Sequence, residues 1–224
     1  MNNSLTNEQK EVYRKSFLEH GDTPKGVFWN NRDTQYLRFE RLLKNFDISM
    51  PFSIHDIGCG TCSLHEYLLD KQIKHDYHGT EIVSEMIETS KNKFPEVALF
   101  NRDILAEKHI ETCDIGIVSG AFYLSGNANK EKWKEYVWMM MNKLFSVTSQ
   151  GVAFNFLTTY KTFSDPSLSY FDPKEVFDYC IKQLSRFVII DHAYPLYEFT
   201  VTVFKEDYLK AKYSSPAYEK YFSK

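Results

Sequence analysis

The chain of 224 residues has little cysteine and no long apolar run. Its four cysteines, Cys59, Cys62, Cys113 and Cys180, are too few for a disulfide scaffold in a protein of this size. The first ten residues are polar and lack the apolar core of a signal peptide. No apolar stretch reaches the roughly 20 residues that span a bilayer. These absences predict a cytoplasmic protein with reduced thiols and no membrane partner.

Basic residues are not in excess. The chain carries 27 Lys and Arg against 30 Asp and Glu, which gives a formal net charge of −3. Proteins that bind a phosphate backbone need a basic face, so we expect no nucleic-acid partner. The histidines show no pairing at metal-ligand spacing. Cys59 and Cys62 form a C-x-x-C pair, but the second pair of a zinc site is missing, so we expect no metal.

From residue 53 onward, short apolar runs alternate with longer amphipathic segments, which is typical of βα units that build a parallel sheet. The pattern predicts strands at 53–57, 77–80, 97–100, 114–119, 152–157, 186–191 and 199–204, and helices at about 63–71, 84–93, 130–146 and 172–184. The short connection through Pro195 predicts that the last two strands form an antiparallel hairpin. The fold class is therefore α/β, a doubly wound seven-stranded and mostly parallel sheet. Residues 1–50 are expected to add a helical cap within the same domain.

A glycine-rich loop follows the first strand. Asp56 is followed by Gly58 and Gly60, and this loop lies at the carboxyl end of the strand, where open α/β sheets bind ligands. Glycine permits a tight turn and close approach of a ligand to the backbone. A nicotinamide-binding loop would favour a third glycine at position 63, where this chain has Ser63. A carboxylate beside the loop suits a ligand that carries an ammonium or sulfonium group.

The run Asp56-Ile57-Gly58-Cys59-Gly60-Thr61 resembles motif I of the class I S-adenosylmethionine-dependent methyltransferases. The resemblance covers roughly residues 50–205 and implies a Rossmann-like methyltransferase fold, with residues 51–224 as the cofactor-binding domain. It implies S-adenosyl-L-methionine as cofactor and S-adenosyl-L-homocysteine as product. The motif residues implied to bind the cofactor are Asp56, Gly58, Cys59, Gly60 and Thr61. Further segments resemble a bacterial subgroup of uncharacterised methyltransferases, which supplies no substrate.

Two further acidic positions agree with this family. Glu81 ends the second strand, where a carboxylate can accept hydrogen bonds from both ribose hydroxyls, and Ile82 follows it. Asp103 matches the family position that accepts from the adenine amino group, and Ile104 is implied to pack on the ring. The alternatives are a charge at a helix N-terminus for Glu81 and a solvated turn for Asp103.

Residues near the transferred methyl group complete the predicted cofactor site. Ser119 and Gly120 end the fourth strand, where the family places the backbone that meets the methionine moiety. Trp29 and Phe122 are candidate aromatic walls for the sulfonium, and core packing is the alternative for Trp29. Arg38 is a candidate partner of the methionine carboxylate, although a surface arginine would look the same in the sequence.

The catalytic candidates are His192 and Tyr123. His192 follows Asp191 and could act as a base towards a hydroxyl acceptor, but most lone histidines are structural. Tyr123 is expected beside the sulfonium. Methyl transfer needs little acid–base chemistry, because the enzyme mainly aligns the acceptor with the sulfur–methyl bond.

The sequence predicts an enzyme that methylates oxygen or nitrogen of a small molecule, such as a metabolite or a natural-product or surface-glycan precursor. No Asp/Asn-Pro-Pro-Tyr motif of the amide and nucleobase N-methyltransferases is present. The alternatives are a regulatory module that binds S-adenosylmethionine without turnover, a nicotinamide oxidoreductase and a protein methyltransferase. We expect a monomer or homodimer whose N-terminal cap selects the acceptor.

Overall fold

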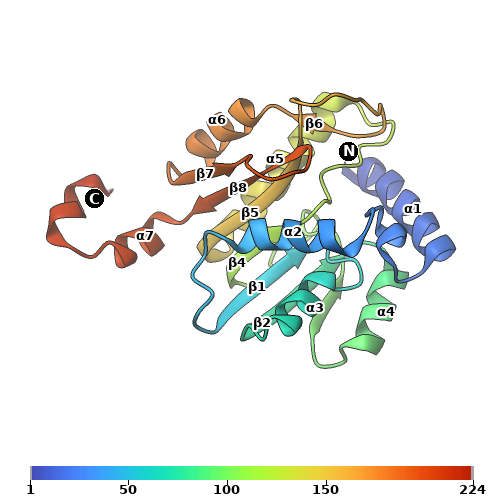
Figure 1. The fold of residues 1–224 in the computed structure, drawn as a ribbon, viewed down its shortest axis with the longest axis horizontal. Helices are drawn as coiled ribbons and strands as arrows, with labels where there is room; N and C mark the ends of the chain where they lie inside the picture. The colour runs from blue at the N-terminus through green and yellow to red at the C-terminus, as the bar shows by residue number, and fades with distance from the viewer. Residues whose placement is uncertain (1, 223–224) are drawn as a thin grey trace.

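The computed structural model describes residues 2–222. One mixed sheet runs through the protein in the strand order β3-β2-β1-β4-β5-β8-β7, and β6 pairs with β5 beside this path (Figure 1). The strands are β1 (Phe52–Ile57), β2 (His75–Glu81), β3 (Ala98–Asn101), β4 (Cys113–Val118), β5 (Thr148–Thr158), β6 (Tyr170–Phe171), β7 (Val188–Asp191) and β8 (Glu198–Phe204). Only the pairs of β8 with β5 and with β7 are antiparallel among these strands. The predicted mostly parallel sheet with an antiparallel C-terminal hairpin is confirmed.

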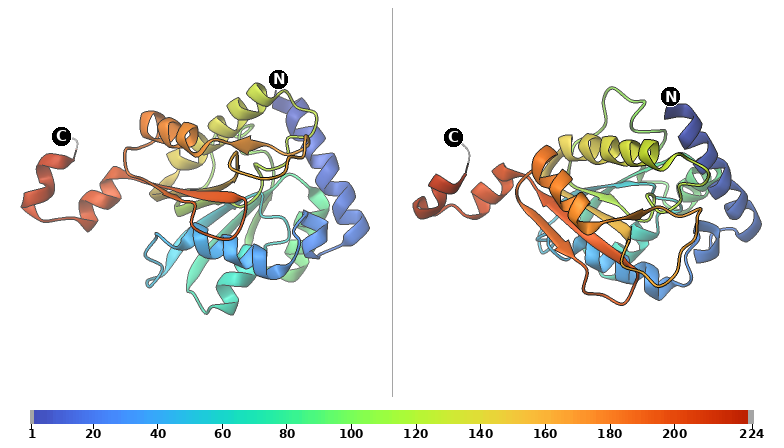
Figure 2. Two further views of the ribbon diagram at one scale, coloured as in Figure 1. Left: turned by 45° about the horizontal axis from the view of Figure 1, so that its top comes forward. Right: turned by 90° about the horizontal axis from the view of Figure 1, so that it is seen from above.

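Helices cover both faces of the sheet (Figures 1 and 2). They are α1 (Asn2–His20), α2 (Arg32–Leu43), α3 (Ser63–Asp70), α4 (Ser84–Lys93), α5 (Lys130–Ser146), α6 (Pro173–Gln183) and α7 (Glu206–Lys212), with short 3-10 helices η1 (Pro24–Val27) and η2 (Pro216–Tyr221). Side chains of α5 and α6 join one hydrophobic core, and side chains of α2, α3 and α4 join a second core. The arrangement is that of a doubly wound fold.

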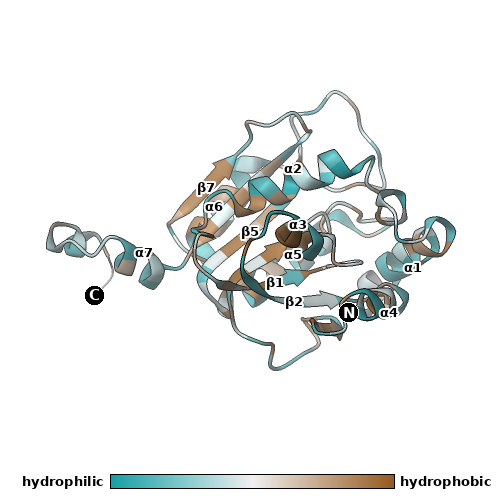
Figure 3. Ribbon diagram, turned by 60° about the horizontal axis from the view of Figure 1, so that its bottom comes forward, coloured by the Kyte–Doolittle hydropathy of each residue, from teal (hydrophilic) through white to brown (hydrophobic). Residues whose placement is uncertain are grey.

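The central strands contribute to both cores because successive side chains of a strand point to opposite faces. In β1, Ile54 belongs to the core under α2 and α3, whereas Ile57 belongs to the core under α5. Figure 3 shows the hydrophobic residues gathered on the central strands, while the outer side of α2 is hydrophilic. Burial on both faces explains the nearly continuous apolar runs of these strands.

Helix α2 of the N-terminal segment packs against the sheet. Phe39 and Leu42 of α2 are buried in the same core as Ile54 of β1. The loop expected between two helices contains η1, which begins at Pro24 and is capped by the Thr23 side chain. These contacts attach the cap to the sheet through a shared hydrophobic core.

Three elements were not predicted. The two-residue strand β6 is too short to show a period. Helix α7 has only seven residues and places only Tyr208 and Leu209, both half-buried, against the core, and η2 has no buried residue, so neither shows a clear amphipathic pattern. Both helices extend away from the rest of the protein (Figures 1 and 2). Strand β7 begins at Val188 instead of residue 186. None of the helices between residues 2 and 222 is long and apolar enough to cross a membrane.

Candidate functional site

A cavity lies where β1, β2 and β4 reach their carboxyl ends. Its empty space, the open mouth included, amounts to about 970 Å³. The predicted residues that line it are Trp29, Asp56, Gly58, Cys59, Gly60, Thr61, Glu81, Ile82, Asp103, Ile104, Ser119, Gly120 and Phe122. The structure thus brings together segments that are far apart in the sequence. Arg38, Tyr123 and His192 are not among its lining residues.

The loop after β1 forms the floor of the cavity. Gly58 and Gly60 have φ values of +75° and +55°, which side-chain-bearing residues rarely adopt. A Cβ at Gly58 would lie 2.9 Å from the Cβ of Ala121. The loop is fixed to β2, because the Gly58 and Cys59 amides both donate to the Thr80 carbonyl, at 2.8 and 3.2 Å. The glycines therefore keep the backbone surface free for a ligand.

Glu81, at the end of β2, holds this loop to the next helix. One carboxylate oxygen accepts from the Gly60 amide at 3.1 Å, and the other accepts from the Ile82 and Val83 amides at 2.7 and 2.9 Å. Burial raises the pKa of Glu81, and the three backbone donors oppose that rise by stabilising the charged form. The carboxylate is thus held in place at the cavity wall.

Asp56 is buried beside Glu81. Its Oδ2 atom accepts a hydrogen bond from the Tyr77 hydroxyl at 2.7 Å, whereas Oδ1 has no partner among the residues that the structure describes. Burial raises the pKa of Asp56 to about 7; the Tyr77 hydrogen bond opposes this rise and the Glu81 charge adds to it. A buried acceptor atom without a donor is costly, which points to a donor from a ligand.

The segment after β3 forms another wall of the cavity. The Asp103 carboxylate accepts from the Leu105 amide at 2.9 Å, and Ile104 is buried in the core under α5. Arg102, which also lines the cavity, pairs with Glu111 and stacks over the ring of Phe100 at 4.1 Å. An acidic and an apolar group therefore stand side by side, as expected for a nucleobase site.

The end of β4 completes the cavity. Gly120 has a φ of +76°, and its amide donates to the Asn155 Oδ1 atom at 2.8 Å. Trp29 packs on this glycine, since an added Cβ would lie 2.4 Å from the Cη2 atom of the indole. The neighbouring Ser119 hydroxyl is buried and has no hydrogen-bond partner within residues 2–222.

Val27 and Phe39, which belong to segments that resemble the bacterial subgroup, line the cavity. The N-terminal segment also contributes wall residues that the sequence did not single out: Gln9, Tyr13 and Gln35. The side-chain amide of Gln9 donates from Nε2 to the Ala121 backbone carbonyl at 2.7 Å. Arg14 forms an ion pair with Glu85. The N-terminal segment therefore contacts the end of β4 and the start of α4. No motif marks these positions, because they belong to helices outside the family resemblance.

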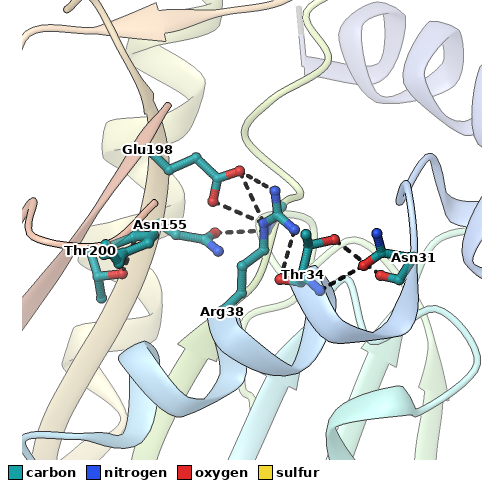
Figure 4. A network of polar contacts seen from close by, with 8 residues as sticks. Asn31, Thr34, Arg38, Asn155, Glu198 and Thr200 are labelled. Atoms are coloured by element: carbon teal, nitrogen blue, oxygen red, sulfur yellow. Dashed lines mark hydrogen bonds and ion pairs between the residues drawn. The ribbon is translucent and has the colours of Figure 1, made fainter. Parts of the chain in front are cut away.

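Arg38 has partners different from the expected methionine carboxylate. Its Nε atom donates to both Glu198 oxygens at 3.0 and 2.9 Å, and Nη1 donates to the Thr34 carbonyl at 2.9 Å (Figure 4). The guanidinium lies 4.1 Å from the Trp29 ring centre. The pair is buried, so Arg38 is neither a surface arginine nor directed into the cavity.

The two catalytic candidates lie outside the cavity wall. His192 is exposed and contacts the rings of Tyr160 and Phe199, so a role as base does not fit its position. Tyr123 lies behind Trp29, with the two ring centres 5.8 Å apart. Its buried hydroxyl lies near the charges of Arg38 and Glu198. Burial, and secondarily the Glu198 charge, raises the pKa of this hydroxyl well above its ordinary value.

The chain as a whole resembles known proteins. No protein-family model matches the chain. Over 158 residues the chain is 34% identical to "Putative methyltransferase Rv1506c" of Mycobacterium tuberculosis (strain ATCC 25618 / H37Rv). The matched region spans 69% of this chain and 94% of that protein.

Solved structures show the same fold. The complex of DhpI with SAM and HEP has a TM-score of 0.65 at 15% identity and covers 88% of this chain and 96% of that chain. A SAM-dependent methyltransferase of Leishmania major has a TM-score of 0.61 at 13% identity. The match covers 89% of this chain and 82% of that chain. The chain belongs to the class I S-adenosylmethionine-dependent methyltransferases, and S-adenosylmethionine is its cofactor.

Proposed function

We propose that the enzyme transfers the methyl group of S-adenosylmethionine to an oxygen or nitrogen atom of a small molecule. The observation that carries this proposal is the contact of the N-terminal segment with the end of β4. Gln9 bonds to the Ala121 carbonyl and Trp29 packs on Gly120, so a wall stands where a protein or nucleic-acid acceptor would need an open groove. Aromatic side chains on this wall suit a compact acceptor.

The residues of the cavity fit the cofactor. We assign the ribose hydroxyls to Glu81 with Ile82 beside it, and the adenine to Asp103 and Ile104. The unpartnered Oδ1 atom of Asp56 is an acceptor for a donor of the methionine part. The positive-φ glycines leave a cradle that a Cβ would fill. The assignment of the methionine carboxylate to Arg38 is withdrawn, because Glu198 and Thr34 already occupy its donors.

When bound, S-adenosylmethionine supplies a methyl group on a sulfonium sulfur. The chain itself has to orient the acceptor and keep water out. Trp29 and Phe122 line the cavity at the end of β4 and offer aromatic surface to a cation. This arrangement relies on alignment and does not require an ionisable base at the methyl group.

The proposal also includes a cytoplasmic location and a monomeric or homodimeric state. The four cysteines are buried free thiols, which suits a reducing compartment. The helical cap and the sheet form one domain in this proposal, and the core shared by α2 and β1 supports that assignment.

A labelling experiment tests the proposal. The full chain is incubated with S-adenosylmethionine carrying a labelled methyl group and a cell extract, and ultrafiltration separates small molecules from macromolecules. Label in the small-molecule fraction is expected, and it should disappear with Glu81→Ala but persist with Glu88→Ala, a change on the exposed side of α4. Label confined to proteins or nucleic acid would refute a small-molecule acceptor.

A further inference from the structure

Gln35 of α2 carries a side-chain amide that faces the cavity. The residue lines the cavity and is only 6% exposed. Its amide forms no hydrogen bond with the residues that the structure describes, and yet neither amide atom is sealed inside the protein. Since the residue has almost no other free surface, the amide opens onto the cavity. A buried amide that the protein leaves unpaired calls for a ligand.

Thr61, at the end of the glycine-rich loop, presents a second unpaired group. It lines the cavity and is 4% exposed, and its hydroxyl has no hydrogen-bond partner within residues 2–222 and is not sealed from the cavity. Phe39 follows Gln35 by one helical turn on the same side of α2, and it shares a core with Cys62 and Leu64. Gln35 and Thr61 therefore reach the same cavity from α2 and from the start of α3.

Helix α3 begins at this point with an open N-terminus. Cys62 is its N-cap residue, with a φ of +65°, and no side chain caps the helix. The first N–H groups of a helix have no partner within the helix and carry a partial positive charge. Ser63 and Leu64, the first two residues of α3, line the cavity. Glu66, the acidic residue of the first turn, is paired with Lys93 at 2.9 Å. The start of α3 therefore favours an anion.

The methionine part of S-adenosylmethionine carries an anion of the right kind. Its ammonium group and its carboxylate are attached to one carbon, so their binding sites have to be neighbours. Asp56, whose unpartnered oxygen suits the ammonium group, precedes the glycine-rich loop, and Thr61 and α3 follow the same loop. Arg102 is the one Lys, Arg or His among the cavity-lining residues that the structure describes, and it is paired with Glu111. The carboxylate therefore has to be recognised by neutral donors.

We infer that Gln35, together with Thr61 and the N-terminus of α3, binds the methionine carboxylate of S-adenosylmethionine without a cation. The Gln35 amide and the Thr61 hydroxyl donate hydrogen bonds, and the start of α3 supplies the positive end of a helix. This inference rests on the cofactor part of the proposed function and not on the acceptor. It replaces the role predicted for Arg38, which lies about one turn further along α2 and bonds to Glu198.

Two ligands that differ only in the carboxylate test this inference. S-adenosylhomocysteine carries the carboxylate, whereas decarboxylated S-adenosylhomocysteine lacks it and keeps the ammonium group. Hydrogen bonds to a charged group raise affinity by about ten- to a hundredfold each. In calorimetric titration, the natural full chain should therefore bind S-adenosylhomocysteine at least about tenfold more tightly than the decarboxylated ligand.

Gln35→Met removes the amide and keeps a side chain of similar volume. Because the amide has no partner in the described chain, urea denaturation should show the stability of the natural protein. Affinity for S-adenosylhomocysteine should fall about tenfold, and affinity for the decarboxylated ligand should stay unchanged. Thr61→Val, a second variant of nearly equal volume, should show the same selective loss. Gln183→Met, at an exposed glutamine of α6, should change neither affinity.

Three results would overturn the inference. The natural protein could bind the two ligands equally, Gln35→Met could weaken both to the same extent, which marks a structural role, or it could leave S-adenosylhomocysteine affinity unchanged, which assigns the amide to the acceptor. In each case both ligands still bind, so the cofactor and the proposed function stand. Failure of the natural protein to bind either ligand would instead remove the proposed function itself.

Discussion

The indole of Trp29 lies so close to Gly120 that a Cβ at residue 120 would be 2.4 Å from Cη2 and 2.5 Å from Cζ2. Gly120 also has a φ of +76°. Gly120→Ala should therefore lower the free energy of unfolding by about 2–4 kcal/mol, from backbone strain and from the overlap with the ring. It should also weaken S-adenosylhomocysteine binding. Urea denaturation and calorimetric titration measure the two effects.

Two variants separate strain from overlap. Gly21 has a φ of +64°, but nothing lies within 4 Å of an added Cβ, so Gly21→Ala should cost only the strain, about 1 kcal/mol. Trp29→Ala in the Gly120→Ala background removes the overlapping ring, so the two changes should be non-additive. Strict additivity would contradict the close contact between the two residues.

Glu81 is expected to be essential for cofactor binding. Both carboxylate oxygens of Glu81 accept from backbone N–H groups, and Glu81→Gln replaces one of these oxygens with an NH2 group, which cannot accept. A charged hydrogen bond contributes about 1.5–3 kcal/mol, so S-adenosylhomocysteine affinity should fall about tenfold to more than a hundredfold in calorimetry. Glu88→Gln, on the exposed side of α4, is the control. Equal affinities for the two variants would refute the assigned role of Glu81.

The strands of the sheet were predictable because each is marked by a local pattern. The apolar runs of β1, β4 and β5 mark strands buried on both faces, and the amphipathic spacing of α5 around Trp133 and Met141 marks its core side. Strand β6 and helix α7 escaped prediction for the opposite reason. Two residues show no period, and a seven-residue helix that packs only Tyr208 and Leu209 on the core shows too short an apolar face to be recognised.

The cofactor side of the cavity was predictable from one contiguous motif and its spacing to Glu81 and Asp103. The opposite wall was not, because Gln9 and Tyr13 reach the cavity through tertiary packing of a helix without a motif. Arg38 shows the limit of charge reasoning. Its position before the sheet suggested a free cation, but only the fold reveals that Glu198, 160 positions later, is its partner.

Asp56 should make the stability depend on pH. Its pKa of about 7 in the folded protein lies above the ordinary value of 3.8, so the folded state binds the proton more tightly than the unfolded state. The stabilisation is full below about pH 4 and is lost as pH rises to about 7, and it amounts to at most about 4 kcal/mol. Asp56→Asn cannot ionise and should lack this loss.

The measurement is urea denaturation of the natural protein and Asp56→Asn at several pH values. The free energy of unfolding of the variant minus that of the natural protein should increase as pH rises through this window and level off above it. Other titrating groups act on both proteins and cancel in the difference. A difference that stays constant would show that Asp56 is ionised in the folded state throughout.

The buried pair of Arg38 and Glu198 should be sensitive to removal of one partner. Glu198→Gln leaves the guanidinium buried without its counter-charge, which should lower the free energy of unfolding by about 3–5 kcal/mol. Asp70 offers a matched exposed pair with Arg32, in which both side chains are more than half exposed. Because water solvates both charges there, Asp70→Asn should cost about 0–1 kcal/mol.

A charge-neutral replacement of the whole pair separates the stability of the fold from cofactor binding. Arg38→Met with Glu198→Gln removes both charges, so it should recover much of the stability lost in Glu198→Gln alone. Because neither residue lines the cofactor cavity, the double variant should bind S-adenosylhomocysteine with the affinity of the natural protein in calorimetric titration. A double variant that is no more stable than Glu198→Gln would contradict the assignment of the lost stability to an unpaired buried guanidinium.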